Sequence, residues 1–217
     1  MAPRSTMDAE LKNIGNEVLK MGEIVETSIV DSIKSLKDKD GELARKIIEA
    51  DEVIDDLQDN INDMCYKFLA TQQPVAGDLR YIISIMKIIN DLERVGDHCE
   101  DIAKYTLRLE GEEYMKDLID IPRMADKASR MVKNAIDAYV HRDLRLARKV
   151  WKADEEVDEM FRDLYEELIG YAEQKEGKER QSIMFLFIVA HLERIADYAT
   201  NICEETVFVL EGTYNME

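Results

Sequence analysis

The sequence contains an internal repeat. Residues 21–55 align without gaps onto residues 124–158, and the run LARK at residues 43–46 recurs at residues 146–149. Self-similarity over such a length is the signature of one supersecondary unit that is built twice. The chain is therefore expected to fold as two copies of the same unit.

The second part of the repeat fixes the extent of each unit. After a connection that is three residues shorter in the second copy, the run LER at residues 92–94 recurs at residues 192–194. We assign the first unit to residues 7–112 and the second to residues 113–212. Each unit carries its own copy of the same acidic residues.

The fold class follows from the scarcity of turn residues and from the spacing of the apolar ones. The chain has only 3 Pro and 9 Gly in 217 residues, too few for a loop-rich or all-β fold. Apolar residues recur at intervals of three and four, which is the period of an amphipathic helix. Long helices with short connections predict antiparallel bundles. We expect an all-α protein of two tandem three-helix bundles, with helices at residues 7–38, 41–72, 78–109, 121–141, 143–174 and 178–211.

The third of these helices shows the apolar stripe most clearly, and Asp78 is placed to cap its start. The residues expected to face the core are Ile82, Ile85, Ile89, Leu92, Gly96, Cys99 and Ala103.

The charge of the chain limits its partners. Lys and Arg number 29 against 47 Asp and Glu, which gives a net charge of −18. Such a chain repels the phosphates of nucleic acids and of anionic membranes. The longest apolar run, residues 183–190, is far shorter than the roughly 20 residues that span a bilayer. We expect no nucleic acid, no direct membrane insertion, and cations or basic protein surfaces as partners.

The three cysteines all lie in apolar helical patterns. Cys65, Cys99 and Cys203 form no C-x-x-C pair, and an odd number makes a poor disulfide framework. They are interpreted as buried, reduced thiols of a cytoplasmic protein.

Two pairs of acids in the first repeat are predicted to share one edge of a helix hairpin. Asp51 and Asp55 lie on the same rotational side of their apolar stripe as Glu93 and Asp97 do on theirs. Pairing Asp51 with Asp97, and Asp55 with Glu93, centres the hairpin on Pro74, inside the expected turn. The four carboxylates should therefore meet at one level.

The second repeat makes the same prediction independently. Asp154 and Asp158 pair with Glu193 and Asp197 about a centre between residues 175 and 176, just before a glycine. Two clusters of four carboxylates are thus expected, one on each repeat.

Four carboxylates on one edge repel one another, and a multivalent cation relieves this repulsion. Ligand sets made of oxygen suit Mg²⁺, Mn²⁺, Ca²⁺ or ferric iron, and carboxylate-bridged iron or zinc clusters are a further possibility. Asp101 and Asn201, one turn beyond the clusters, could extend them. The alternative is that lysines and arginines neutralise the acids. Arg94 and Arg194 could orient the carboxylates or form ordinary salt bridges.

The histidines give a weaker signal than the acids. His98 and His191 flank the two LER runs but do not occupy equivalent positions, so each is interpreted as a partly buried or surface residue. His141 is expected to lie in an exposed loop.

The motifs DLERVGD at residues 91–97 and HLERIAD at residues 191–197 resemble those of the PhoU family of phosphate-transport regulators. The resemblance extends from residue 7 to residue 212, and it includes DLR at residues 78–80 and NI at residues 201–202. It implies two three-helix bundles related by a pseudo-twofold axis. It also implies metal clusters held by pairs of acids, here Asp51/Asp55, Glu93/Asp97, Asp154/Asp158 and Glu193/Asp197.

The resemblance implies a function as well. The family acts in negative regulation of phosphate uptake and of the phosphate-starvation response. Its partners are the ATPase subunit of a phosphate ABC transporter and a phosphate sensor kinase, and it works at the inner face of the membrane. A homodimer is also expected. The sequence departs from the common pattern at His98, Cys99 and Asp101, which affects the ligands and metal identity but not the fold.

Two other functions are a carboxylate-bridged metal enzyme and a metal-free adaptor. A di-iron carboxylate enzyme needs Glu-x-x-His pairs that point into a bundle, and no histidine here has a Glu three residues before it. We therefore expect a protein without catalytic activity, with no catalytic residues. A metal-free helical adaptor is the remaining alternative.

Overall fold

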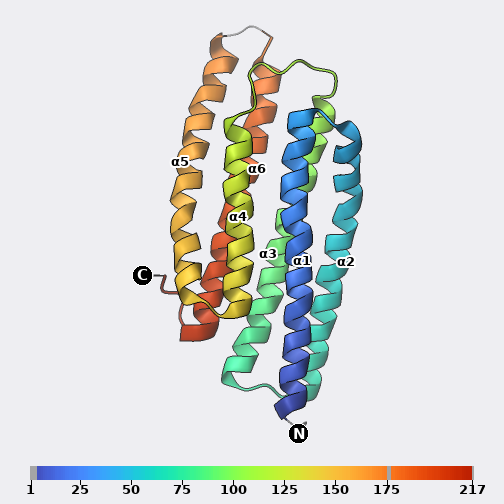
Figure 1. The fold of residues 1–217 in the computed structure, drawn as a ribbon, viewed down its shortest axis with the longest axis vertical. Coiled ribbons are helices and arrows are strands. Elements are labelled where there is room, and N and C mark those ends of the chain that lie inside the picture. The colour runs from blue at the N-terminus through green and yellow to red at the C-terminus, as the bar shows by residue number, and fades with distance from the viewer. Residues whose placement is uncertain (1–3, 175–176, 217) are drawn as a thin grey trace.

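The computed structural model describes residues 4–174 and 177–216, which form long helices aligned along one axis (Figure 1). The described part contains no strand. The ends of its helices lie within three residues of those predicted. The all-α prediction is confirmed. The helices are α1 (Arg4–Asp38), α2 (Gly41–Gln72), α3 (Ala76–Arg108), α4 (Asp120–His141), α5 (Leu144–Gln174) and α6 (Glu179–Glu211).

The helices group as the repeat predicts. Helices α1, α2 and α3 pack against one another on one side of the molecule, and α4, α5 and α6 do so on the other (Figure 1). The two groups are joined because α1 packs on α4 and α3 packs on α6. Their buried side chains form one continuous hydrophobic cluster that runs through both groups.

The turn between the first two helices of each group is built in the same way twice. Lys39 and Arg142 have left-handed backbone conformations, with φ of 55° and 56°. Each is followed by an aspartate that caps the next helix: Asp40 accepts from the amide of Leu43 at 2.9 Å, and Asp143 from that of Leu146 at 3.0 Å. An aspartate in this position satisfies one of the free amides at a helix start.

The predicted cap of α3 is wrong. The helix begins at Ala76, two residues earlier than expected, and the extended residue before it, Val75, makes no side-chain cap. Asp78 lies inside the first turn instead. The capping position is occupied by Val75, so Asp78 lies three residues too late to cap the helix. Its negative charge still interacts favourably with the positive end of the helix dipole.

Helices α3 and α6 run antiparallel across the boundary between the repeats. Near the start of α3, the hydroxyl of Ser84 donates to the carboxylate of Glu205 near the end of α6, at 2.8 Å. Near the end of α3, Tyr105 stacks on Phe187 with ring centroids 5.6 Å apart. An antiparallel contact between equivalent helices is the arrangement that a pseudo-twofold axis perpendicular to the helices produces.

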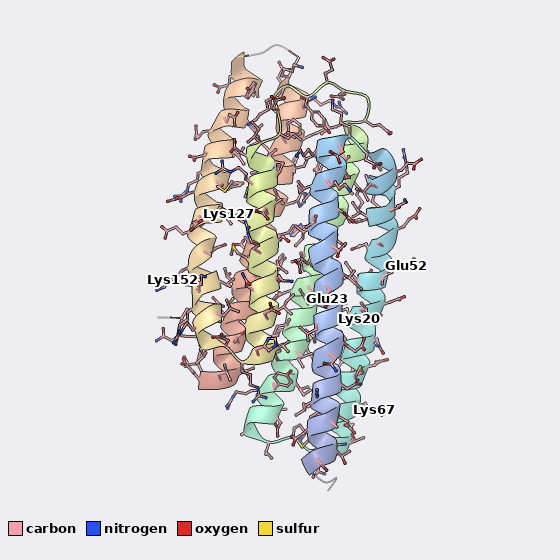
Figure 2. All side chains as sticks on the ribbon, in the orientation of Figure 1. Lys20, Glu23, Glu52, Lys67, Lys127 and Lys152 are labelled. Carbon is pink, nitrogen blue, oxygen red and sulfur yellow. The ribbon has the colours of Figure 1, made fainter. Side chains whose placement is uncertain are left out.

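Charged side chains project outward around the whole bundle. Figure 2 shows Lys20, Glu23, Glu52 and Lys67 pointing away from the helix axes into solvent. Among the described residues, none of the helices combines the length and the hydropathy that a membrane span requires.

Candidate metal centres

The first repeat brings its predicted acids together on the rim between α2 and α3. Burial, and then the neighbouring charges of Glu100, Asp55, Asp97 and Glu93, together raise the pKa of Asp51 from 3.8 to about 6. Carboxylates influence one another in this way only at short range. The acids predicted from hairpin register therefore lie close together.

The same cluster acts on its two α3 members. Burial raises the pKa values of Glu93 and Asp97, and the charge of Asp55 raises both of them further. The side chain of Glu93 is 18% exposed and that of Asp97 is 37% exposed, so the cluster lies at the surface and not in the core.

The second repeat reproduces this arrangement between α5 and α6. Burial, and then the charges of Asp158, Asp197 and Glu193 in that order, together raise the pKa of Asp154 to about 6. Oδ1 of Asp154 is buried and has no hydrogen-bond partner. A buried carboxylate oxygen without a donor is costly, and a bound cation would satisfy it.

The arginine that recurs in both repeats forms an ion pair within each cluster. Nη1 of Arg94 lies 3.1 Å from Oδ2 of Asp97, and Nη1 of Arg194 lies 3.4 Å from Oδ2 of Asp197. Both arginines are more than half exposed, at 53% and 64%, so each pair is weak. A single guanidinium of this kind does not balance four mutually repelling carboxylates.

Gly96 allows α2 to approach α3 at the first cluster. A Cβ atom on this residue would lie 2.9 Å from Oδ1 of Asp51 and 2.9 Å from Cδ1 of Ile54. Glycine therefore makes room for the carboxylate at this point. The equivalent position in the second repeat is Ala196.

Glu100 is a member of the first cluster that the sequence analysis missed. It lies on α3, it pairs with Lys104, and among the charges that raise the pKa of Asp51 it has the largest effect. The spacing of Glu93, Asp97 and Glu100 is that of one helical face, so this pattern could have revealed it. The second repeat has Thr200 at this position.

Asp101 and Asn201 lie toward the boundary between the repeats. Oδ2 of Asp101 is 4.0 Å from Nε2 of His191, although Asp101 also raises the pKa of Asp97. Burial and the charge of Glu205 raise the pKa of Asp91 to about 7, although Asn201 hydrogen-bonds to this group across the same boundary and opposes the rise. Their role as additional cluster ligands remains a prediction.

The donor sets of the two acidic clusters fit hard multivalent cations. All the donors are carboxylate oxygens, and Asp51, Asp55, Glu93 and Asp97 repel one another without a cation. Within the described part of the chain, only one group of at least three donors, which contains Asp101, has all its atoms within 4.8 Å of one another. The acidic clusters are more open, so binding requires their carboxylates to swing inward.

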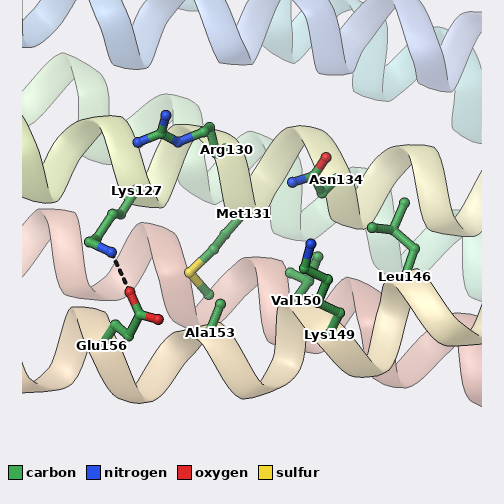
Figure 3. A pocket seen from close by; sticks show the side chains of 9 residues that line it. All are labelled: Lys127, Arg130, Met131, Asn134, Leu146, Lys149, Val150, Ala153 and Glu156. Carbon is green, nitrogen blue, oxygen red and sulfur yellow. Dashed lines mark hydrogen bonds and ion pairs between the residues drawn. The ribbon is translucent and has the colours of Figure 1, made fainter.

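A surface pocket between α4 and α5 has different chemistry. Met131 and Val150 lie at its apolar floor, and Lys127 and Lys149 lie at its rim (Figure 3). Lys127 is already paired with Glu156 across the pocket, so the charges do not converge on a ligand (Figure 3). This pocket is therefore not the favoured site.

Two three-helix repeats, each with an acidic cluster on the rim between its second and third helices, define a class of duplicated helical-bundle proteins. The PhoU domain matches this chain twice, at residues 18–106 and 121–206. The chain belongs to the PhoU family.

Individual relatives are similar to this chain over almost its whole length. The chain is 39% identical to the phosphate-specific transport system accessory protein PhoU homolog of Clostridium acetobutylicum, over 96% of each sequence. It is similar to the crystal structure of PhoU from Pseudomonas aeruginosa, with a TM-score of 0.91, 33% identity, and coverage of 95% of this chain and 99% of the other. The phosphate transport system regulatory protein PhoU from Streptococcus pneumoniae gives a TM-score of 0.90 at 32% identity, with 96% and 99% covered.

These relatives confirm the predicted family and fold. They are named as accessory and regulatory proteins, which also confirms the prediction that this chain is not an enzyme.

Proposed function

We propose that this protein is a negative regulator of phosphate uptake and of phosphate-starvation signalling. It contacts the ATPase subunit of a phosphate ABC transporter and a phosphate sensor kinase, at the cytoplasmic face of the membrane. The names of its relatives, which are accessory proteins of phosphate-specific transport systems, support a regulatory role in phosphate transport. Its net charge of −18 favours basic protein surfaces as partners.

The observation that carries the metal part of this proposal is the duplicated acidic cluster. In both repeats an aspartate of the second helix, Asp51 or Asp154, has its pKa raised to about 6 by burial and by neighbouring acids. A cation held by these groups supplies positive charge on an otherwise repulsive surface. The metal is iron, zinc, magnesium or manganese. Its ligands are Asp51, Asp55, Glu93 and Asp97 in the first repeat, and Asp154, Asp158, Glu193 and Asp197 in the second.

Metal content of the purified chain tests the ligand assignment. The Asp51→Ala/Glu93→Ala variant should lose about half of the bound metal, because only one of the two clusters is removed. The Asp154→Ala/Glu193→Ala variant should lose the other half. Elemental analysis after gel filtration gives the measurement.

A matched control uses acids outside the clusters. Glu23 and Glu52 are exposed and point into solvent (Figure 2). The Glu23→Ala/Glu52→Ala variant removes the same charge and should retain all the metal. Unchanged metal content in the cluster variants would reject the ligands and favour the metal-free adaptor.

Binding experiments test the partners. The chain should bind the purified ATPase subunit and the cytoplasmic part of the sensor kinase, with affinities that differ between high and low phosphate. Absence of binding to both, under both conditions, would contradict the regulatory contact. Sedimentation velocity of the chain alone tests the proposed homodimer.

A further inference from the structure

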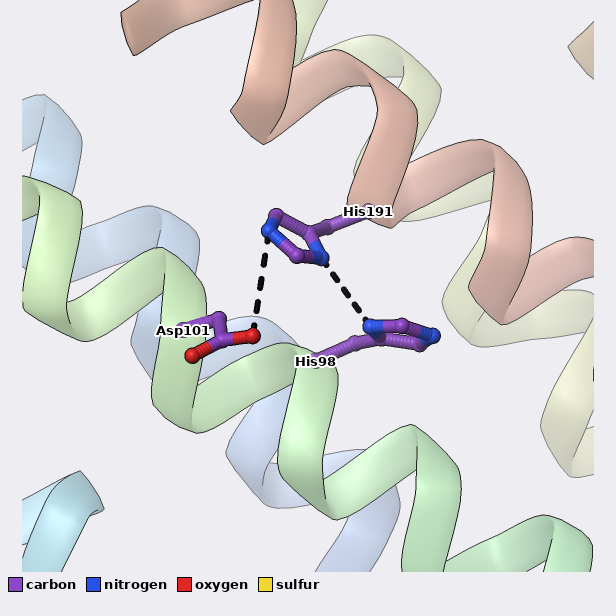
Figure 4. A group of neighbouring side chains, drawn as sticks. All are labelled: His98, Asp101 and His191. Atoms are coloured by element: carbon purple, nitrogen blue, oxygen red, sulfur yellow. Dashed lines mark hydrogen bonds and ion pairs between the residues drawn. The ribbon is translucent and has the colours of Figure 1, made fainter.

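Two histidines from different repeats meet at the boundary between α3 and α6. Nδ1 of His98, on α3, lies 3.0 Å from Nδ1 of His191, on α6 (Figure 4). Asp101, one turn further along α3, places Oδ2 4.0 Å from Nε2 of His191 (Figure 4). One donor atom from each of the three residues can be chosen so that all three lie within 4.8 Å of one another.

One donor in this group lacks a partner. Nε2 of His98 is buried and forms no hydrogen bond. The rings are held by aromatic neighbours: Tyr198 lies 5.7 Å from His98, and Tyr105 lies 5.9 Å from His191, between ring centroids. Nε2 lies on the side of the His98 ring away from His191 and Asp101, so the ligand atom of His98 is Nδ1, which faces His191 (Figure 4).

The charge state of the histidines suits ligation. Burial, together with the charges of His191, Arg194 and Arg94, lowers the pKa of His98 to about 4, although Asp101 opposes the shift. Burial also lowers the pKa of His191, and Asp101 opposes this effect. Both rings are therefore neutral near pH 7 and keep a lone pair for a metal ion.

We propose that His98, Asp101 and His191 form a third metal site, which binds one transition-metal ion such as Zn²⁺ or Fe²⁺ and takes Asp101 as its own ligand in place of a role in the first acidic cluster. Two imidazoles and one carboxylate are the donors that such ions prefer, whereas the acidic clusters offer only oxygen. Bonds of about 2.0 to 2.2 Å require donors no more than about 4.2 Å apart, so small side-chain rotations close the site. Further coordination positions remain open to water.

The site occurs once per chain because the two repeats differ at its three positions. The residues equivalent to His98, Asp101 and His191 are Tyr198, Asn201 and Asp91. On that side of the boundary, Asn201 and Asp91 hydrogen-bond to each other instead. The expected stoichiometry is one ion, against one cluster in each repeat for the acidic sites.

A metal ion at this site would tie the two repeats together. Its ligands come from α3 of the first repeat and α6 of the second, so the ion binds only when the repeats are packed as in the folded chain. Ligands that bind only the folded state stabilise it. The site therefore offers control of the packing between the repeats, independently of the proposed acidic clusters.

Nitrogen NMR of the full chain tests the site directly, because the chain has only 3 histidines. The acidic clusters are first disabled by Ala at Asp51, Glu93, Asp154 and Glu193. One equivalent of Zn²⁺ should then shift the ring resonances of His98 and His191. The resonances of His141, which is exposed, should stay in place. No shift at the pair, or equal shifts of all three histidines, would overturn the proposal.

A substitution already present in the other repeat gives the second measurement. In the same background, His98→Tyr copies the residue at position 198 and should lower Zn²⁺ binding in equilibrium dialysis from one equivalent to none. The His141→Gln control should keep one equivalent. Retention of Zn²⁺ by a folded His98→Tyr chain would reject the ligand assignment.

Discussion

Oδ1 of Asp51 lies 2.9 Å from the position that a Cβ atom would take on Gly96. The contact brings a carboxylate of α2 against the backbone of α3, where a larger side chain would displace it. At the first acidic cluster a methyl group on residue 96 would therefore force Asp51 and Ile54 to move. This relationship links the packing of the hairpin to the geometry of the proposed metal ligands.

Gly96→Ala should weaken the first cluster. The new Cβ would collide with Asp51 and with Ile54, so the carboxylate must move and the hairpin must open slightly. Overpacking of this kind costs about 1 to 3 kcal/mol of stability. Metal binding by the first repeat should fall, while that of the second repeat stays unchanged. Urea unfolding and metal analysis provide the two measurements.

Gly77→Ala is the matched control for this change. Gly77 also lies in α3, and nothing lies within 4 Å of the position of its Cβ. Alanine there should raise stability by about 0.4 to 1 kcal/mol, because it restricts the unfolded chain. Equal effects of the two substitutions would show that the contact with Asp51 is unimportant.

Stability of the metal-free chain should depend on pH through Asp51 and Asp154. Their folded pKa values are about 6, against 3.8 ordinarily, so the folded chain binds more protons than the unfolded chain between about pH 4 and 6. Their stabilising contribution is fully present below the unfolded pKa and is lost as pH rises through the folded one. Metal-free protein should therefore lose stability over this range.

The variant Asp51→Asn/Asp154→Asn isolates the contribution of these two groups. Subtracting its unfolding free energy from that of the parent at each pH should leave a difference that falls between about pH 4 and 6. A difference that rises with pH would mean that the acids are stabilised as anions. Added Mg²⁺ or Mn²⁺ should reverse the loss near pH 7, because cations compete with protons for the same oxygens.

Much of the fold could be predicted because its determinants are local. All seven residues of the apolar stripe in α3 are buried, from Ile82 to Ala103. Helical period alone locates such a stripe. The proximity of the acidic pairs could also be predicted, since two helices joined by a short turn have a register fixed by that turn. The centre predicted for the second hairpin, between residues 175 and 176, lies outside the described residues.

The histidine pair could not be predicted in the same way. His98 and His191 belong to different repeats, and no short connection fixes the register of α3 against α6. Their contact depends on how the two bundles pack as a whole. The repeat does not duplicate these two histidines, so no pattern marked them as a pair, although their Nδ1 atoms lie 3.0 Å apart.

The three cysteines should be unreactive in the folded chain. All are buried and free, as predicted. Burial raises the pKa of Cys65 and of Cys203 to about 12, and it also raises that of Cys99, so almost no thiolate is present near pH 7. A thiol-specific chromogenic disulfide should detect no thiol before unfolding and 3 thiols in urea. Fast reaction of the native chain would contradict this burial.

Glu205 should stabilise the packing between the repeats. Its carboxylate is buried on α6, and it accepts from Ser84 and Lys87 of α3, each at 2.8 Å, and from Tyr214 at 3.2 Å. Glu205→Ala leaves these donors without their acceptor at the boundary. The expected loss is about 1 to 3 kcal/mol, since the buried hydroxyl of Ser84 loses its acceptor, whereas the exposed Lys87 and Tyr214 can bond to water.

Glu205→Gln separates the charge of this group from its shape. The amide keeps an acceptor for the hydroxyl of Ser84 but loses the charge that faces Lys87, so it should lose less stability than alanine. Glu204→Ala removes the adjacent, less buried acid and serves as the control, with a change within about 0.5 kcal/mol. Urea unfolding of the three variants orders them. If Glu204→Ala were as destabilising as Glu205→Ala, net charge on α6 and not the specific contacts with α3 would govern the packing of the two repeats.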